Sequence, residues 1–161
     1  MTTTFEGSFQ GAHLRIAIVA SRFNEALVER LVEGAIDCVA RHGVPDEYIS
    51  VTWVPGAFEL PMAAKRLAAS GEVDAVVCVG AVVRGDTPHF DFVAGAAAHG
   101  ITDAALETGV PITFGVLTTD DADQAADRAG GKMGNKGAEA ALAAIEMANL
   151  FAALPKPATE L

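Results

Sequence analysis

The sequence is poor in cysteine. Cys38 and Cys78 are its two cysteines, lie forty residues apart and belong to no Cys-x-x-Cys pair. This spacing gives no support to a disulfide framework or a thiolate zinc site. Cys78 falls within the apolar run 75–79, where we expect a small buried hydrophobic residue rather than a nucleophile.

Positive charge is also scarce. The chain of 161 residues has 11 Lys and Arg against 21 Asp and Glu, which gives a net charge of −10. We therefore expect no nucleic-acid partner, because phosphate backbones are bound by clustered lysines and arginines. In a chain this acidic, cations grouped in a glycine-rich loop become candidates for binding an anionic ligand.

Long apolar runs are missing. Hydrophobic residues make up 51% of the chain and the mean hydropathy is +0.32, yet no run approaches the ~18 residues that a membrane helix needs. The first residues show no basic segment followed by an apolar stretch, so we expect no secretory signal, no membrane partner and a cytoplasmic protein. This composition excludes a disordered chain, and the apolar surplus favours an oligomer with buried subunit interfaces.

Common nucleotide and nucleophile motifs are absent as well. The chain has no GxxxxGK(S/T), and residues 80–85 lack the middle glycine of GxGxxG. No GxSxG elbow occurs, and neither cysteine stands beside a histidine. P-loop, dinucleotide-binding and Ser or Cys nucleophile chemistry are therefore not supported.

What the chain does contain is an alternation of apolar runs and amphipathic stretches. The pattern predicts one α/β domain, with a parallel sheet covered by helices on both faces. The segment 73–83 contains a strand that is apolar on both faces, which predicts a central position in the sheet. Asn24 is a candidate N-cap for the first helix. The predicted strands are 14–20, 48–54, 73–83 and 111–117, and the predicted helices are 25–43, 59–70, 90–107, 122–129 and 138–154.

Ligands of such sheets bind outside the carboxyl ends of the strands, and candidate residues follow each strand. Phe23 can pack on the next helix or stack on a planar heterocycle. Glu59 can stabilise a helix start or accept hydrogen bonds from ligand hydroxyls. Arg128 and Lys136, in and beside the glycine-rich loop 130–137, can be solvated or can bind an anion.

The segment 84–89 joins the third strand to a helix and combines features of an anion site. A glycine turn before a helix exposes backbone N–H groups, and Thr87 adds a hydroxyl. His89 can act as a general acid or base, can cap the helix, or can bind a metal with Asp86 and Asp91. We disfavour the metal because only one histidine lies in the region.

Five blocks of sequence together resemble one enzyme family. They are IVASRFN at 18–24, PGAFELP at 55–61, GAVVRGDTPHFD at 80–91, PITFGVL at 111–117 and RAGGKMGNKG at 128–137. In this order they are similar to the 6,7-dimethyl-8-ribityllumazine synthases of riboflavin biosynthesis, over about residues 5–151. The resemblance implies a single domain over 1–161, with an N-terminal arm at 1–12 and a C-terminal tail at 155–161.

This resemblance implies a flavodoxin-like three-layer αβα sandwich with a four-stranded parallel sheet, and a transferase that uses no cofactor and no metal. The reaction would condense 5-amino-6-(D-ribitylamino)uracil with L-3,4-dihydroxy-2-butanone 4-phosphate, releasing phosphate and water. His89 would transfer protons. The pyrimidinedione and ribityl groups would be bound by Phe23, Ala57, Phe58, Glu59, Ala81, Val82, Val83, Phe114 and Lys136, and the phosphate by Asp86, Thr87 and Arg128.

The resemblance also implies an assembly. Phe114, Arg128 and Lys136 would come from the adjacent subunit of a pentamer, and the compact turn 130–137 favours a sixty-subunit icosahedral shell. Riboflavin synthase is a candidate partner. Asp86 is an unusual residue for a phosphate loop and would act through its backbone N–H. Two other functions stay open, namely a non-catalytic flavin or lumazine carrier and a purely structural shell protein.

Overall fold

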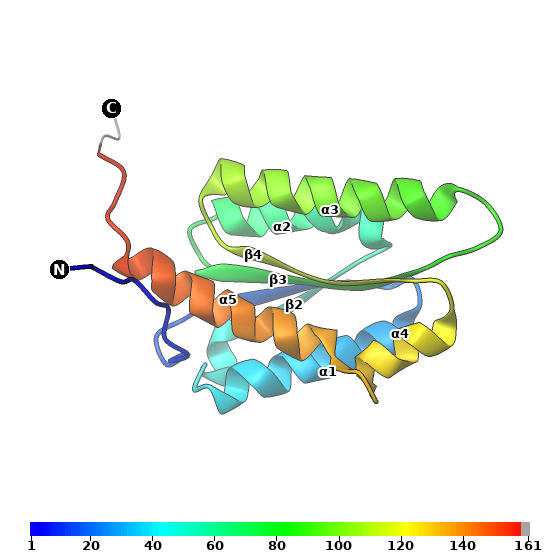
Figure 1. The fold of residues 1–161 in the computed structure, drawn as a ribbon, viewed down its shortest axis with the longest axis horizontal. Coiled ribbons are helices and arrows are strands. Elements are labelled where there is room, and N and C mark those ends of the chain that lie inside the picture. Colours follow the sequence, from blue (N-terminus) through cyan, green and yellow to red (C-terminus); the bar gives the residue numbers. More distant parts are fainter. Residues whose placement is uncertain (159–161) are drawn as a thin grey trace.

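The computed structural model describes residues 1–158 as one αβα unit (Figure 1). Five longer helices and four longer strands alternate along the chain. Two short 3-10 turns, 46–48 and 57–59, precede β2 and α2. The elements are β1 (Ile16–Ser21), α1 (Glu25–Arg41), β2 (Ile49–Val54), α2 (Leu60–Ala69), β3 (Ala75–Val83), α3 (His89–Thr108), β4 (Ile112–Thr119), α4 (Ala122–Arg128), β5 (Ala129–Gly131), β6 (Gly134–Asn135) and α5 (Lys136–Ala153).

The four longer strands form one parallel sheet in the order β2-β1-β3-β4. Helices α2 and α3 cover one face, and α1, α4 and α5 cover the other (Figure 1). The covered parallel sheet confirms the prediction from the sequence pattern, and the three-layer, flavodoxin-like sandwich confirms the fold that the family resemblance implied. The strand predicted to be central, β3, lies between β1 and β4.

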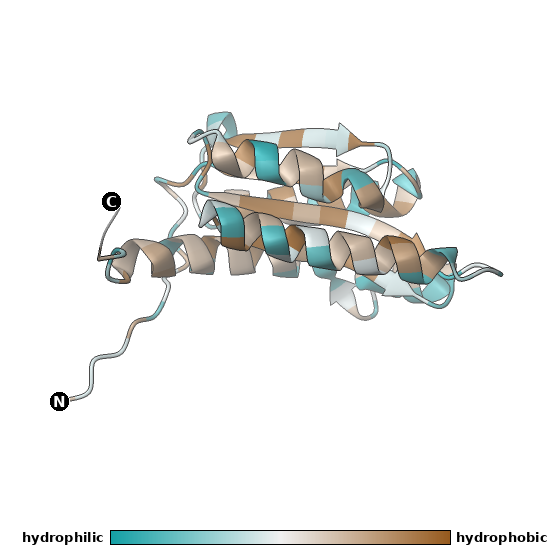
Figure 2. Cartoon of the chain, turned by 90° about the horizontal axis from the view of Figure 1, so that it is seen from above, coloured by the Kyte–Doolittle hydropathy of each residue, from teal (hydrophilic) through white to brown (hydrophobic). Residues whose placement is uncertain are grey.

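Alternation along the strands divides the core into two halves. On β1, Ile16 and Ile18 pack with α1 and α5, whereas Ala17 and Val19 pack with α2 and α3. Residues 75–82 of β3 are buried on both faces, as a strand between two helical layers requires. Figure 2 shows one strand with the apolar colour along most of its length, while another strand and several helices carry alternating polar and apolar bands.

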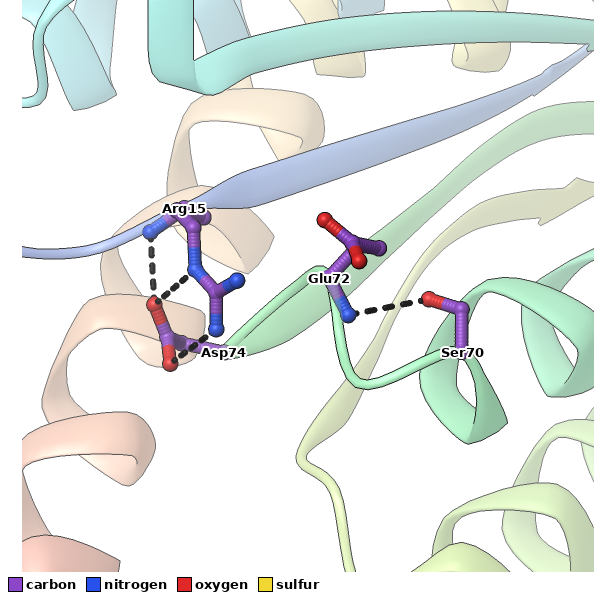
Figure 3. A network of polar contacts seen from close by, with 4 residues as sticks. All are labelled: Arg15, Ser70, Glu72 and Asp74. Atoms are coloured by element: carbon purple, nitrogen blue, oxygen red, sulfur yellow. Dashed lines mark hydrogen bonds and ion pairs between the residues drawn. The ribbon is translucent and has the colours of Figure 1, made fainter.

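An ion pair joins β1 and β3 where both strands begin (Figure 3). The Asp74 carboxylate accepts a hydrogen bond of 2.8 Å from the backbone N–H of Arg15 and two of 3.4 Å from its guanidinium. The Asp74 N–H donates in return to the Arg15 carbonyl at 2.8 Å. These contacts fix the register of the two inner strands at the end of the sheet opposite the predicted site.

The first helix begins differently from the prediction. Asn24 stands at the N-cap position, but its backbone is left-handed (φ 60°) and its side chain caps nothing. The Asn24 amide instead donates to the Ala81 carbonyl at 3.0 Å. The residue therefore ties the β1–α1 connection to the end of β3, a long-range role that propensity alone does not indicate.

The glycine-rich segment 130–137 is also more ordered than the predicted loop. It contains the short antiparallel hairpin β5–β6, with Gly130 and Gly134 at positive φ. Asn135 caps α5 by accepting a hydrogen bond from Ala138 N–H at 3.1 Å. Helix α5 consequently begins at Lys136, two residues before its predicted start.

The described N-terminal and C-terminal segments both leave the fold near the end of α5 (Figure 1). Residues 1–11 form no helix or strand, but the Asn149 side chain donates to the Ser8 and Gln10 carbonyls at 2.8 and 3.0 Å. The arm is thereby held against α5. The predicted tail 155–161 extends beyond the described residues, which stop at 158.

Candidate active site

A cleft of 670 Å³ opens at the carboxyl ends of β1, β2 and β3. This is where the topology of a parallel sheet places ligand sites. The structure brings the predicted residues of three connections together there. The cleft is lined by Phe23, Pro55, Gly56, Ala57, Phe58, Glu59, Ala81, Val82, Val83, Gly85, Thr87, His89, Phe90, Phe92 and Val93.

Phe23 is the second residue after the end of β1. Hydrogen bonds hold its backbone, with Phe23 N–H donating to the Pro55 carbonyl at 3.1 Å and Arg22 N–H donating to the Val54 carbonyl at 2.8 Å. The ring itself is 72% exposed. Phe23 is therefore not a packing residue of α1 within its own chain, and its aromatic face is available at the cleft.

The turn 57–59 forms the neighbouring wall. Ala57 is buried, whereas Phe58 and Glu59 are exposed. Glu59 stands at the N-cap of α2, but its side chain makes no cap hydrogen bond. Its carboxylate lies close to Gly56, where an added Cβ would come within 3.2 Å of Oε2. The carboxylate oxygens thus remain free to accept hydrogen bonds from a ligand.

The end of β3 supplies the apolar floor. Ala81 and Val82 are buried and Val83 is half-buried. The Asn24 amide bonded to the Ala81 carbonyl keeps this strand end next to Phe23. A flat ring can therefore lie between an aromatic side chain and the end of a buried strand.

The β3–α3 connection closes the cleft. Gly85, Thr87 and His89 line it, and all three are exposed. Thr87 Oγ accepts from His89 N–H at 3.4 Å. The N-terminus of the long helix α3 adds a partial positive charge at this place. Asp86, between two lining residues, does not itself line the cleft.

Three predicted residues lie elsewhere on this chain. Arg128 and Lys136 line a second hollow of 270 Å³, between the end of β4 and the start of α5. The Arg128 guanidinium donates to the Gln124 carbonyl at 3.0 Å. Phe114 lies on the edge strand β4 and is 37% exposed. One copy of the chain therefore does not gather the whole predicted set.

Among the lining residues of the first cleft, the ionisable side chains are Glu59 and His89, and there is no lysine or arginine. In residues 1–158, no group of three His, Cys, Asp or Glu side chains is arranged to hold a metal ion. Over the same part of the chain, none of the helices combines the length and apolar character needed to cross a bilayer.

Phe90, Phe92 and Val93 line the cleft but were not predicted from the sequence. Phe92 is one helical turn beyond His89 and is 74% exposed. Helical spacing from His89 could have indicated it, since residues three apart share a helix face.

Comparison with known proteins identifies relatives of the chain. The family model of 6,7-dimethyl-8-ribityllumazine synthase matches residues 13–152. Two proteins bearing that name are similar to the chain, one from Chlorobium phaeovibrioides and one from Clostridium kluyveri. The first is 58% identical, covering 92% of this chain and 96% of the relative. The second is 52% identical, covering 91% and 96%. The chain therefore belongs to the 6,7-dimethyl-8-ribityllumazine synthase family.

Proposed function

We propose that the 670 Å³ cleft catalyses the condensation of 5-amino-6-(D-ribitylamino)uracil with L-3,4-dihydroxy-2-butanone 4-phosphate, as a transferase of riboflavin biosynthesis. Family membership supports the reaction. The observation that carries the assignment of the site is the exposed Phe23 ring facing the same cleft as Glu59, Thr87 and His89. An aromatic face, a free carboxylate and a helix N-terminus match a heterocycle, a polyol and a phosphate respectively.

Each wall then has a role. Phe23 stacks on the pyrimidinedione, and Ala81, Val82 and Val83 border the ring. Ala57, Phe58 and Glu59 hold the ribityl chain, with Glu59 accepting hydrogen bonds from its hydroxyls. Gly85 and Thr87 offer an N–H and a hydroxyl to the phosphate, and Asp86 acts through its backbone N–H.

The chemistry needs positioning more than an enzyme-bound nucleophile. The substrate amine attacks the ketone and water leaves to give an imine; phosphate then leaves by elimination, and a second carbonyl addition with loss of water closes the ring. Holding two reactants in place can supply up to ~7–11 kcal/mol of the barrier. His89, at the cleft mouth, moves protons between these steps, a contribution of typically ~10²–10⁴-fold.

The phosphate site is completed by a second copy of the chain. The cleft contains no cation of its own, whereas Arg128 and Lys136 gather in the second hollow and Phe114 projects from the open edge of β4. An adjacent subunit that places this edge over the cleft would neutralise the phosphate dianion. The active site is thus shared between neighbours.

Shared sites can be tested by complementation. Phe23→Ala damages one side of each site and Arg128→Ala the other, so co-expressed variants in a mixed ring regain about one intact site in four. Activity at low substrate should then exceed that of either variant alone. A site built within one chain would regain nothing on mixing.

The ring we propose is a pentamer, assembled into a sixty-subunit shell. Exposed apolar side chains such as Met62, Phe92 and Leu106 need cover in an assembly, and the hairpin β5–β6 keeps the turn before α5 compact. Light scattering in phosphate and in a non-phosphate buffer measures the particle mass. A pentamer in both buffers would exclude the shell, and an active monomer would exclude the shared site.

The competing function is a flavin or lumazine carrier without turnover. Such a carrier needs Phe23 and Glu59 but no phosphate site, so Thr87 and Arg128 favour the enzyme. Incubation of the purified protein with both substrates decides between them. The enzyme produces lumazine absorbance and fluorescence together with released phosphate, whereas a carrier produces neither.

A further inference from the structure

Arg84, the residue that follows β3, lies at the centre of a small network. Its Nε donates to Asp120 Oδ1 at 3.0 Å, and its Nη1 lies 3.7 Å from Asp91 Oδ1. Its guanidinium carbon lies 4.4 Å from the centroid of the Phe90 ring. The Arg84 side chain thus connects the start of α3 with the loop between β4 and α4.

The Asp120 end of this bridge is fixed. Arg84 N–H donates to the Thr119 carbonyl at 2.8 Å, which holds the arginine backbone against the end of β4. Asp120 N–H donates to the Gln124 side chain at 2.9 Å, and Asp121 accepts from Gln124 N–H at 2.8 Å. The backbone of Asp120 is therefore held beside Asp121, the N-cap of α4.

The other end of the bridge has weaker support. Residues 84–89 are exposed, and a Cβ on Gly85 would meet nothing within 4 Å. Pro88, at the N-cap of α3, makes no side-chain cap, and the Thr87–His89 hydrogen bond is long at 3.4 Å. The contacts of Arg84 with Phe90 and Asp91 are thus well placed to order this turn.

We propose that Arg84 is a positioning residue for the reaction. By joining the first turn of α3 to Asp120, it fixes the position of His89 and of the phosphate-binding residues 85–87. This inference rests on the function proposed above. Arg84 does not line the cleft, so it acts through the turn rather than on the phosphate. Lysine cannot replace it fully, because an ammonium lacks the planar fork that meets two carboxylates and stacks on a ring.

The test compares Arg84→Met, Arg84→Lys and Asp120→Asn with wild type in the assembled enzyme. Asp37→Asn is the matched control, because Asp37 forms an exposed ion pair with Arg41 at 2.9 Å on α1, outside the cleft lining. Steady-state kinetics give KM for each substrate and kcat. Amide hydrogen exchange of residues 85–92 reports the order of the turn without depending on activity.

We expect Arg84→Met to raise KM for the butanone phosphate about 3- to 10-fold and to lower kcat, as for loss of an exposed ion-pair network with a cation–π contact. Asp120→Asn removes one ion pair and keeps the cation–π contact, so its effect should be smaller, about 1.4- to 5-fold. KM for the uracil stays unchanged, exchange accelerates only in 85–92, and the double variant is no worse than Arg84→Met. Arg84→Lys falls between wild type and Arg84→Met, and Asp37→Asn matches wild type.

Unchanged exchange in 85–92 in both Asp120→Asn and Arg84→Met would overturn the proposal. The proposal would also be overturned if KM for the butanone phosphate rose in Arg84→Met but stayed at or fell below the wild-type value in Asp120→Asn. In that case Arg84 would bind the phosphate directly, and releasing its guanidinium from Asp120 would not weaken binding. Full rescue by Arg84→Lys would reduce the role to charge alone and also overturn it. A wild-type enzyme that forms no lumazine would refute the proposed function, while the exchange measurement would still decide the role of Arg84.

Discussion

Truncation of Phe23 separates ligand stacking from folding. The Phe23 ring is 72% exposed, so its removal sacrifices little packing, and the backbone hydrogen bond from Phe23 N–H to Pro55 is kept in Phe23→Ala. Stacking of a base on an aromatic side chain is worth ~1–3 kcal/mol. At 1.4 kcal/mol for each tenfold step, KM for the uracil should rise about 5- to 150-fold.

The assay is steady-state kinetics with each substrate varied in turn, together with thermal unfolding and particle size. Phe151→Ala is the matched control, because Phe151 is 46% exposed and lies in the last turn of α5, away from the cleft lining. Phe23→Tyr keeps the ring face and should retain most of the affinity, whereas Phe23→Leu keeps apolar area without the face and should lose most of it.

An unchanged KM for the uracil in Phe23→Ala would remove this residue from the site. Equal affinity in Phe23→Leu and wild type would show that apolar area, not stacking, is what the ligand uses. A parallel rise in both KM values with a lower melting temperature would indicate a folding defect.

Three further outcomes are expected. Arg128→Ala should raise KM for the butanone phosphate about 10- to 150-fold, the loss of a hydrogen bond to a charged group. KM for the uracil should change little, and an equal effect on both would indicate misfolding. His89→Ala should lower kcat towards ~10²-fold while leaving measurable turnover, since proton transfer is one contribution among several; complete inactivity at saturating substrate would contradict this. Burial raises the pKa of Cys78 from 9.0 to about 12, so the unfolded thiol ionises first and stability is lost as pH rises from about 9 to 12. In Cys78→Ala, the unfolding free energy should fall less steeply with rising pH in this range, by about 1.4 kcal/mol per pH unit. The check is denaturant unfolding at a series of pH values. The same dependence of unfolding free energy on pH in the variant and in wild type would show that Cys78 does not titrate there.

The sequence predicted the layers of the fold because they depend on local pattern. The run 75–82 is apolar at every position, as in a short strand covered on both faces, and β3 is that strand. The start of α5 was predicted less well, since it depends on one side chain, Asn135, that caps the helix while its amide donates to the Arg30 carbonyl at 3.0 Å. A contact over that sequence distance has no local signature.

In the candidate site too, some features follow from local sequence pattern and others depend on long-range contacts. Position after a strand end was enough to select Phe23, Glu59 and His89, because parallel topology brings those ends to one edge. It could not show that Arg128 lies in a different hollow of the same chain, since that depends on how β4 and α4 lie relative to β3. Nor could it show that Arg84 is engaged by Asp120, 36 positions away in the sequence.

Both described ends of the chain leave the fold beside the last turn of α5, while the β3–α3 connection lies at the opposite end of the molecule (Figure 1). For protein engineering, this makes either terminus an attachment point for a tag, a fluorophore or a cargo peptide that starts remote from the substrate entrance. Ends that emerge on the same side also suit circular permutation. A linker joining them would place the new break at an exposed turn such as the one after Ser70.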